Sequence, residues 1–175
     1  MPPRKKKSNE STAKQRNQFA IHSAAAAGDV ALVELLLNEG VDVNLGDQFG
    51  VTPLQMAVSS SKIDVVYLLI NRGADVSAQK DPNKCTPLYR AVLTRRVDVA
   101  LLLLKNGADV NACGSTTNTP LHMAVRMDCV EAAKLLIEFG ADVNARREVD
   151  FATPLHLVAE TGANGYPRVQ LLIGN

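Results

Sequence analysis

Apolar residues of this chain fall at helical spacing in short groups that are separated by polar turns. From Val97, the segment VDVALLLLKNG places apolar Val97, Leu101 and Leu104 on one helical face. It ends at Lys105, with Gly107 two positions later. A basic residue in the last turn and a glycine just beyond it are typical of a helix C-terminus. The pattern therefore predicts a helix that stops just before Gly107.

The same ending occurs three more times along the chain. The phrases LNEGVD, INRGAD and IEFGAD end at Asp42, Asp75 and Asp142. An extended segment, DVN or DVS, follows in each case and is too short to form a further helix. Each repeated helix is thus expected to lead into a projecting loop.

A second phrase marks the start of an earlier helix in each unit. Four Thr-Pro-Leu copies begin at Thr52, Thr86, Thr119 and Thr153, with spacings of 34, 33 and 34 residues. A threonine oxygen accepts a hydrogen bond from an unpaired N–H of the first helical turn. Proline suits the next position because its fixed φ matches the helix. One unit is therefore predicted to be helix, turn, helix and loop.

These phrases carry a family resemblance. TPLHMAV at Thr119 and the segment LLLKNGADVNA resemble the ankyrin repeat, whose period is about 33 residues. FAIHSAA at Phe19 lies one period before Thr52, and it brings His22 into register with His122 and His156. The resemblance implies an all-α ankyrin solenoid behind an N-terminal arm of residues 1–17. Its expected units are 18–49, 50–83, 84–116, 117–150 and an incomplete 151–175.

The resemblance to the family also implies structural roles for single positions. The histidine of the TPLH phrase is a structural hydrogen-bonding residue in the family, which argues against a metal role for His122 and His156. After the first helix the family usually has glycine, whereas this chain has Ser61, Arg95 and Asp128. If these three residues adopt a left-handed φ, each should cost on the order of 1 kcal/mol and make the middle of the stack less rigid than an idealised repeat array.

The last unit departs from the frame. Pro167 lies in an insertion before the second helix, and the sequence ends at Asn175 before a closing glycine. The sequence therefore predicts a truncated product with a short terminal helix, and fraying or self-association from about Tyr166 onward.

Composition and charge refine this picture. The chain is 46% hydrophobic but only 4% aromatic, as expected for thin aliphatic helix faces. Residues 1–17 carry a net charge of +5, whereas the remainder carries −4. Such a polar arm is expected to be disordered. Its basic run is a candidate nuclear localisation signal or nucleic-acid contact, with a solubilising terminus as the alternative. The run consists of Arg4, Lys5, Lys6 and Lys7.

Several classes of chemistry are not expected. No apolar stretch is long enough to predict a membrane span. The three cysteines, Cys85, Cys113 and Cys129, form no C-x-x-C pair, which favours a reducing, intracellular compartment (cytoplasmic, nuclear or both). Neither a converging catalytic set nor a glycine-rich phosphate loop is present, so we predict a protein without metal, cofactor or enzymatic activity.

What remains is a binding surface made by the loops and the first helices, which family members use to bind proteins. The expected contact residues vary within the fixed frame: Phe49, Met56, Arg90, Met123, Arg146, Arg147, Phe151 and Leu157. For Met56, Met123 and Leu157 the alternative is packing against a neighbouring repeat. The prediction is an adaptor or regulatory subunit for a protein partner. The alternatives are a nuclear protein that binds nucleic acid through its arm, or the recognition part of a larger ubiquitin-ligase or enzyme complex.

The DVN loops suggest one modification. Asn44, Asn111 and Asn144 each end such a loop, eight residues after a leucine. This resembles the context in which ankyrin-type repeats become substrates of an asparaginyl hydroxylase. The alternative is that these asparagines bond their own loop backbone.

Overall fold

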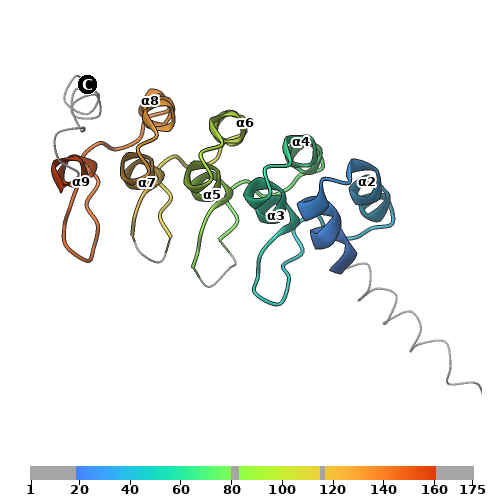
Figure 1. Ribbon diagram of the computed structural model, residues 1–175. Helices are drawn as coiled ribbons and strands as arrows, with labels where there is room; N and C mark the ends of the chain where they lie inside the picture. Colours follow the sequence, from blue (N-terminus) through green and yellow to red (C-terminus); the bar gives the residue numbers. More distant parts are fainter. Residues whose placement is uncertain (1–18, 80–82, 115–116, 161–175) are drawn as a thin grey trace, which may run out of the picture. The chain divides into compact units, whose positions relative to one another are not determined.

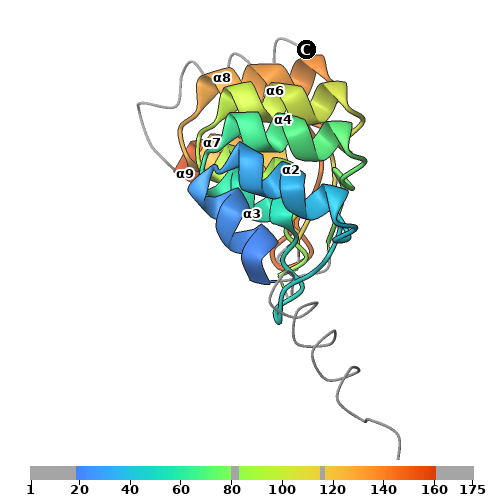
Figure 2. The ribbon, with the colours of Figure 1, turned by 90° about the vertical axis from the view of Figure 1, so that its right-hand side faces the viewer.

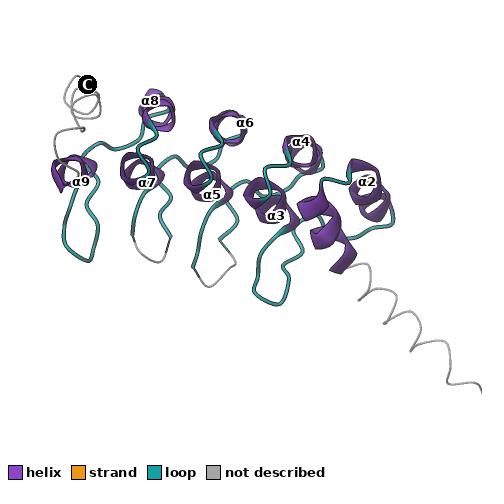
Figure 3. Ribbon diagram, in the orientation of Figure 1, coloured by secondary structure: helices purple, strands orange, loops and turns teal. Residues whose placement is uncertain are grey.

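The computed structural model describes residues 19–79, 83–114 and 117–160 (Figure 1). Regular secondary structure in these ranges is helical throughout (Figure 3). The chain divides into two compact units, Met1–Asp75 and Val76–Asn175. The basic arm and the chain beyond residue 160, including the segment from Tyr166 for which fraying is predicted, lie outside the described residues.

The first unit contains two helical pairs. Residues 19–27 are helical, and α2 (Val30–Asn38) follows them. The second pair is α3 (Pro53–Ser59) and α4 (Ile63–Asn71). Helix α4 packs against both α3 and α2.

The second unit repeats this arrangement. Its helices are α5 (Pro87–Leu93), α6 (Val97–Lys105), α7 (Pro120–Arg126), α8 (Val130–Glu138) and α9 (Pro154–Glu160). Helices α5, α7 and α9 form one row, and α6 and α8 lie side by side in a second row (Figures 1 and 2). The described parts of the loops before α5, α7 and α9 project from the same side of this unit (Figure 1). The second unit is therefore a stack of helix pairs with aligned loops.

The Thr-Pro-Leu phrases start helices as predicted. Thr52, Thr86 and Thr119 are N-caps with extended backbone, and proline is the first helical residue in each case. Each threonine Oγ1 accepts a hydrogen bond from the N–H three residues later, at 3.3, 3.1 and 3.4 Å respectively. This confirms the predicted capping chemistry.

Left-handed residues end the helices. Gly73 and Gly107 have φ of 83° and 84°, and a Cβ built on either would meet no atom within 4 Å. Glycine is therefore needed there for its backbone angle alone. The three positions at which the family usually has glycine are also left-handed, since Ser61, Arg95 and Asp128 have φ of 58°, 57° and 53°. Each costs roughly 1 kcal/mol of folding free energy relative to a relaxed conformation.

The core of each unit consists mainly of leucine, valine and alanine. The largest side chains with no exposed surface include Leu54 and Leu69 in the first unit. In the second unit they include Leu88, Leu103, Leu121 and Leu136. These leucines recur once per helix, so the core repeats with the same period as the sequence.

Candidate protein-binding site

The loops are shaped by aspartates at one repeated position. Asp42 accepts a hydrogen bond from the N–H of Asn44 at 2.9 Å, and Asp142 accepts one from Asn144 at the same distance. Asp109 does the same for Asn111, also at 2.9 Å. This Asx turn gives each loop a defined start.

Two asparagines then connect neighbouring loops within a unit. In the first unit, Asn44 Oδ1 accepts from the N–H of Asp75 at 2.7 Å, and its Nδ2 donates to the carbonyl of Gly73 at 3.4 Å. In the second unit, Asn111 bonds Asp142 N–H and the Gly140 carbonyl in the same way, at 2.8 and 3.4 Å.

These bonds correct one sequence expectation. The side chains of Asn44 and Asn111 bond the backbone of the next repeat's loop, whereas their own loops are closed by aspartate. The reason is that an amide offers a donor and an acceptor together, which matches the carbonyl and the N–H of the next loop's backbone. Asn111 and Asn144 are exposed and Asn44 is half-buried. Hydroxylation of the three asparagines remains a prediction.

His122 joins helix α7 to the loop before α9. Its Nδ1 accepts from the backbone N–H of Thr119 at 3.3 Å, which completes a capping box. Its Nε2 donates to the carbonyl of Ala152 at 3.1 Å. Burial holds the pKa of His122 below its usual value, and the nearby Arg147 guanidinium acts in the same direction. The geometry gives His122 a structural role, as the resemblance implies.

We predict that stability will depend on pH through His122. Because its folded pKa is lowered, its contribution is complete above the unfolded value of about 6.5 and is lost as pH falls toward the folded pKa. Gln55 occupies the same position in the α3 capping box, where its Oε1 accepts from Thr52 N–H at 2.8 Å. His122→Gln should therefore change the free energy of unfolding at pH 8 by only about 1 kcal/mol and reduce the loss on acidification.

Thermal unfolding of both proteins between about pH 8 and pH 5.5 measures this difference. His22 and His156 are present in both, so a change in slope reports on His122. An unchanged pH slope in the glutamine variant would contradict the assignment.

The apolar residues among the predicted contacts differ in exposure. Phe49 and Phe151 are 59% and 69% exposed on loops. Met123 and Leu157 retain only 3% and 5% exposure, so packing accounts for both. Met56 is half-buried.

The three arginines differ in their surroundings. Arg90 is half-buried on α5, and Arg146 is exposed in the loop before α9. Arg147 donates to the carboxylate of Asp150, with Nε at 3.0 Å, and therefore braces its own loop. Of the predicted residues in the second unit, the structure places Arg146, Arg147 and Phe151 together on one loop.

One feature of these loops was not predicted. The residue two positions before each N-cap threonine has a left-handed φ: 76° at Gly50, 49° at Lys84, 53° at Thr117 and 57° at Phe151. Only the first of these is glycine, and that glycine is the signal in the sequence that marks the position. A phenylalanine here costs roughly 1 kcal/mol, and such strained residues cluster at functional sites.

Other chemistry is limited in the part of the chain that the structure describes. No group of three or more potential metal ligands occurs among these residues. None of the described helices has the length and apolarity needed to cross a membrane. Cys85, Cys113 and Cys129 are free thiols, half-buried, exposed and buried respectively.

Comparison with known families identifies the class. The family model described as ankyrin repeats (3 copies) matches residues 5–80, 21–113 and 78–147. A second, described as ankyrin repeats (many copies), matches residues 126–173. The chain belongs to the ankyrin repeat family, which confirms the predicted fold class. Ankyrin repeats generally mediate protein–protein interactions and are typically non-catalytic.

Individual relatives match over shorter stretches. Ankyrin repeat, SAM and basic leucine zipper domain-containing protein 1 of Notamacropus eugenii is 41% identical over 80 residues, which is 46% of this chain and 16% of the relative. The protein of the same name from Equus caballus is 50% identical over 58 residues, 33% of this chain and 12% of the relative. This chain thus spans 16% or less of the length of these relatives.

Proposed function

We propose that this chain is a non-catalytic recognition module that binds a protein partner inside the cell, as an adaptor or regulatory subunit. The observation that carries the proposal is the presentation of Phe49 and Phe151 on loops, where both aromatic rings are largely exposed. Exposed aromatic residues are costly to leave in water, and they dominate the energetics of protein interfaces.

Both loops are held in shape before any partner binds. Asp47 Oδ1 accepts from the N–H groups of Phe49 and Val51 at 2.8 and 2.9 Å. Asp150 Oδ1 accepts a hydrogen bond from the N–H of Ala152 at 3.1 Å and another from Arg147 Nε at 3.0 Å. A preorganised loop loses little conformational entropy on binding, so it retains more of its contact energy as affinity.

A positively charged side chain near Phe151 would give the contact with the partner a defined orientation. Arg146 is exposed on the same loop as Phe151. A guanidinium binds a carboxylate in a bidentate manner, which adds orientation to the apolar contact. Arg90 is proposed to contribute from helix α5.

The proposal is tested with a variant in which Phe49, Arg90, Arg146 and Phe151 are replaced by alanine. Proteins captured by the wild-type chain from a cell extract and identified by mass spectrometry should be lost or strongly reduced with this variant. Helical circular dichroism and the unfolding midpoint should remain nearly unchanged, since loop and surface substitutions contribute little to stability.

A matched control removes two aromatic and two basic residues from the second helices and their C-caps instead. It replaces Tyr67, Lys105, Lys134 and Phe139, all of which are exposed. This control should retain the captured proteins. Equal capture by wild type and the loop variant, or equal loss in the control, would contradict the proposed surface.

A further inference from the structure

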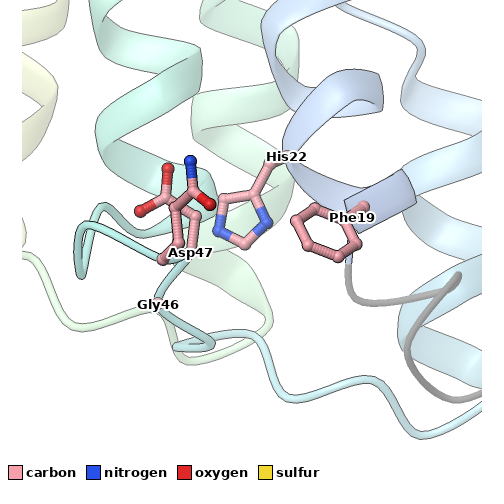
Figure 4. Close-up of a pocket in the computed structure, with 5 residues that line it drawn as sticks. Phe19, His22, Gly46 and Asp47 are labelled. Atoms are coloured by element: carbon pink, nitrogen blue, oxygen red, sulfur yellow. The ribbon is translucent and has the colours of Figure 1, made fainter.

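The first unit contains a pocket that plays no part in the protein-binding surface proposed above. It has a volume of about 260 Å³ and is lined by Phe19, His22, Gly46, Asp47 and Gln48. In Figure 4 the imidazole of His22 lies between the ring of Phe19 and the side chain of Asp47. The pocket thus lies between the first helical segment and the loop that precedes α3.

The backbone of this loop fixes the pocket. His22 Nε2 lies 3.0 Å from the Leu45 carbonyl oxygen and 2.9 Å from that of Val51, so a single N–H on this nitrogen is shared between two carbonyls of the loop. Gly46 approaches Gly50 so closely that a Cβ on Gly46 would lie 3.1 Å from the Gly50 Cα. These contacts hold the wall of the pocket in place without a ligand.

Two side chains give the pocket its chemistry. The ring of Phe19 is 65% exposed, although the sequence frame has a capping threonine at this position in the next four units. The carboxylate of Asp47 is oriented by two backbone N–H groups through Oδ1. An aromatic face and a carboxylate in one pocket suit a cation, which interacts favourably with both.

Within this unit the described residues carry a charge that favours the same ligand, whereas residues 1–17 carry +5. Residues 19–75 contain seven acidic and two basic residues, a net charge of −5. One of the two cations, Arg72, is paired with Glu34 at 2.6 Å. A field of this sign attracts basic segments and repels acidic ones.

We propose that this pocket binds a cationic side chain, with arginine preferred, from a basic segment of the protein partner. Arginine is preferred because its planar guanidinium stacks on an aromatic ring and binds a carboxylate at the same time. The inference rests on the proposed protein-binding function and specifies the chemistry of the partner at the first unit.

The test uses the full chain and two short probe peptides. They are acetyl-Gly-Arg-Gly-amide and its citrulline counterpart, which has nearly the same shape without the charge. In amide NMR titrations, the arginine peptide should shift the signals of Gly46, Asp47 and Gln48, and the citrulline peptide should not. Asp47→Asn should weaken arginine-peptide binding by about two- to fivefold, and Phe19→Leu by a similar factor.

Asp42→Asn is the matched control for charge. Asp42 and Asp47 each accept backbone N–H bonds through Oδ1, which asparagine can also do, but only Asp47 lines the pocket. The control should leave the affinity within about 1.5-fold of wild type, because exposed charges outside the contact are strongly screened.

Three results of the peptide titrations would overturn the proposal, and a fourth would come from deleting the arm. The three are equal binding of the two peptides, equal weakening by Asp42→Asn and Asp47→Asn, and shifts confined to residues outside the pocket. Binding that appears only after residues 1–17 are deleted would also overturn it, because the chain's own basic arm would then be the occupant. Loss of protein capture in the loop variant is independent of these outcomes, so failure of the pocket and failure of the proposed function are distinguishable.

Discussion

Replacing Leu103 with alanine is expected to lower the free energy of unfolding by about 2–5 kcal/mol. Leu103 lies on α6 with no exposed surface. Helix α6 packs against both α5 and α8, so the side chain belongs to a core shared between neighbouring repeats. In such a stack each repeat is stabilised mainly by its neighbours, and a cavity between two of them weakens both. Urea unfolding followed by circular dichroism measures the loss.

Leu93→Ala provides the control in the same unit. Leu93 is on α5 but is 43% exposed, so its truncation removes less buried area and leaves no closed cavity. Its cost should be about 1 kcal/mol or less. Similar losses for the two variants would show that Leu103 does not occupy the shared core.

The local chemistry of single residues allowed much of this fold to be predicted. Thr119 and Pro120 mark a helix start because the cap and the fixed φ act within one turn, without help from distant residues. The left-handed φ of Arg95 occurs where the family usually has glycine, so the repeat frame marked this position. The helix start depends on sequence neighbours alone, whereas the Arg95 position was recognised through the family resemblance.

Features that depend on neighbouring repeats were harder to predict. Asn111 was expected to bond its own loop or act as a modification site, yet its amide spans to Gly140 and Asp142 of the next repeat. The burial of Met123 and the exposure of Phe151 likewise depend on which face meets a neighbour. The sequence gives residue types at repeated positions, whereas these outcomes depend on how adjacent repeats pack.

The pocket beside Phe19 is the clearest case of this kind. Phe19 is near His22 in the sequence, but Asp47 is about one repeat away and comes close only because the loop folds back. No short motif contains these residues together. A signal was nonetheless present, since Phe19 replaces the threonine that the other units have at this position.

Replacing Phe151 with glycine is expected to raise the stability of the fold and to weaken binding. The residue has a φ of 57° and its side chain is 69% exposed, so it is strained while making few contacts that stabilise the fold. Glycine adopts this φ without a steric penalty. Phe151→Gly should therefore be more stable than Phe151→Ala by about 1 kcal/mol, because alanine retains the left-handed strain.

Both variants lack the aromatic ring, so both should bind the partner about equally weakly. If Phe151 is an anchor at the interface, the loss should be about 2 kcal/mol or more, roughly a 30-fold decrease in affinity. Urea unfolding gives the stability order, and titration of the captured partner gives the affinities. Equal stability of the glycine and alanine variants would show that the loop stores no strain at Phe151. Wild-type affinity in both variants would show that Phe151 does not contact the partner. The strained backbone at φ 57° would then have no role in binding.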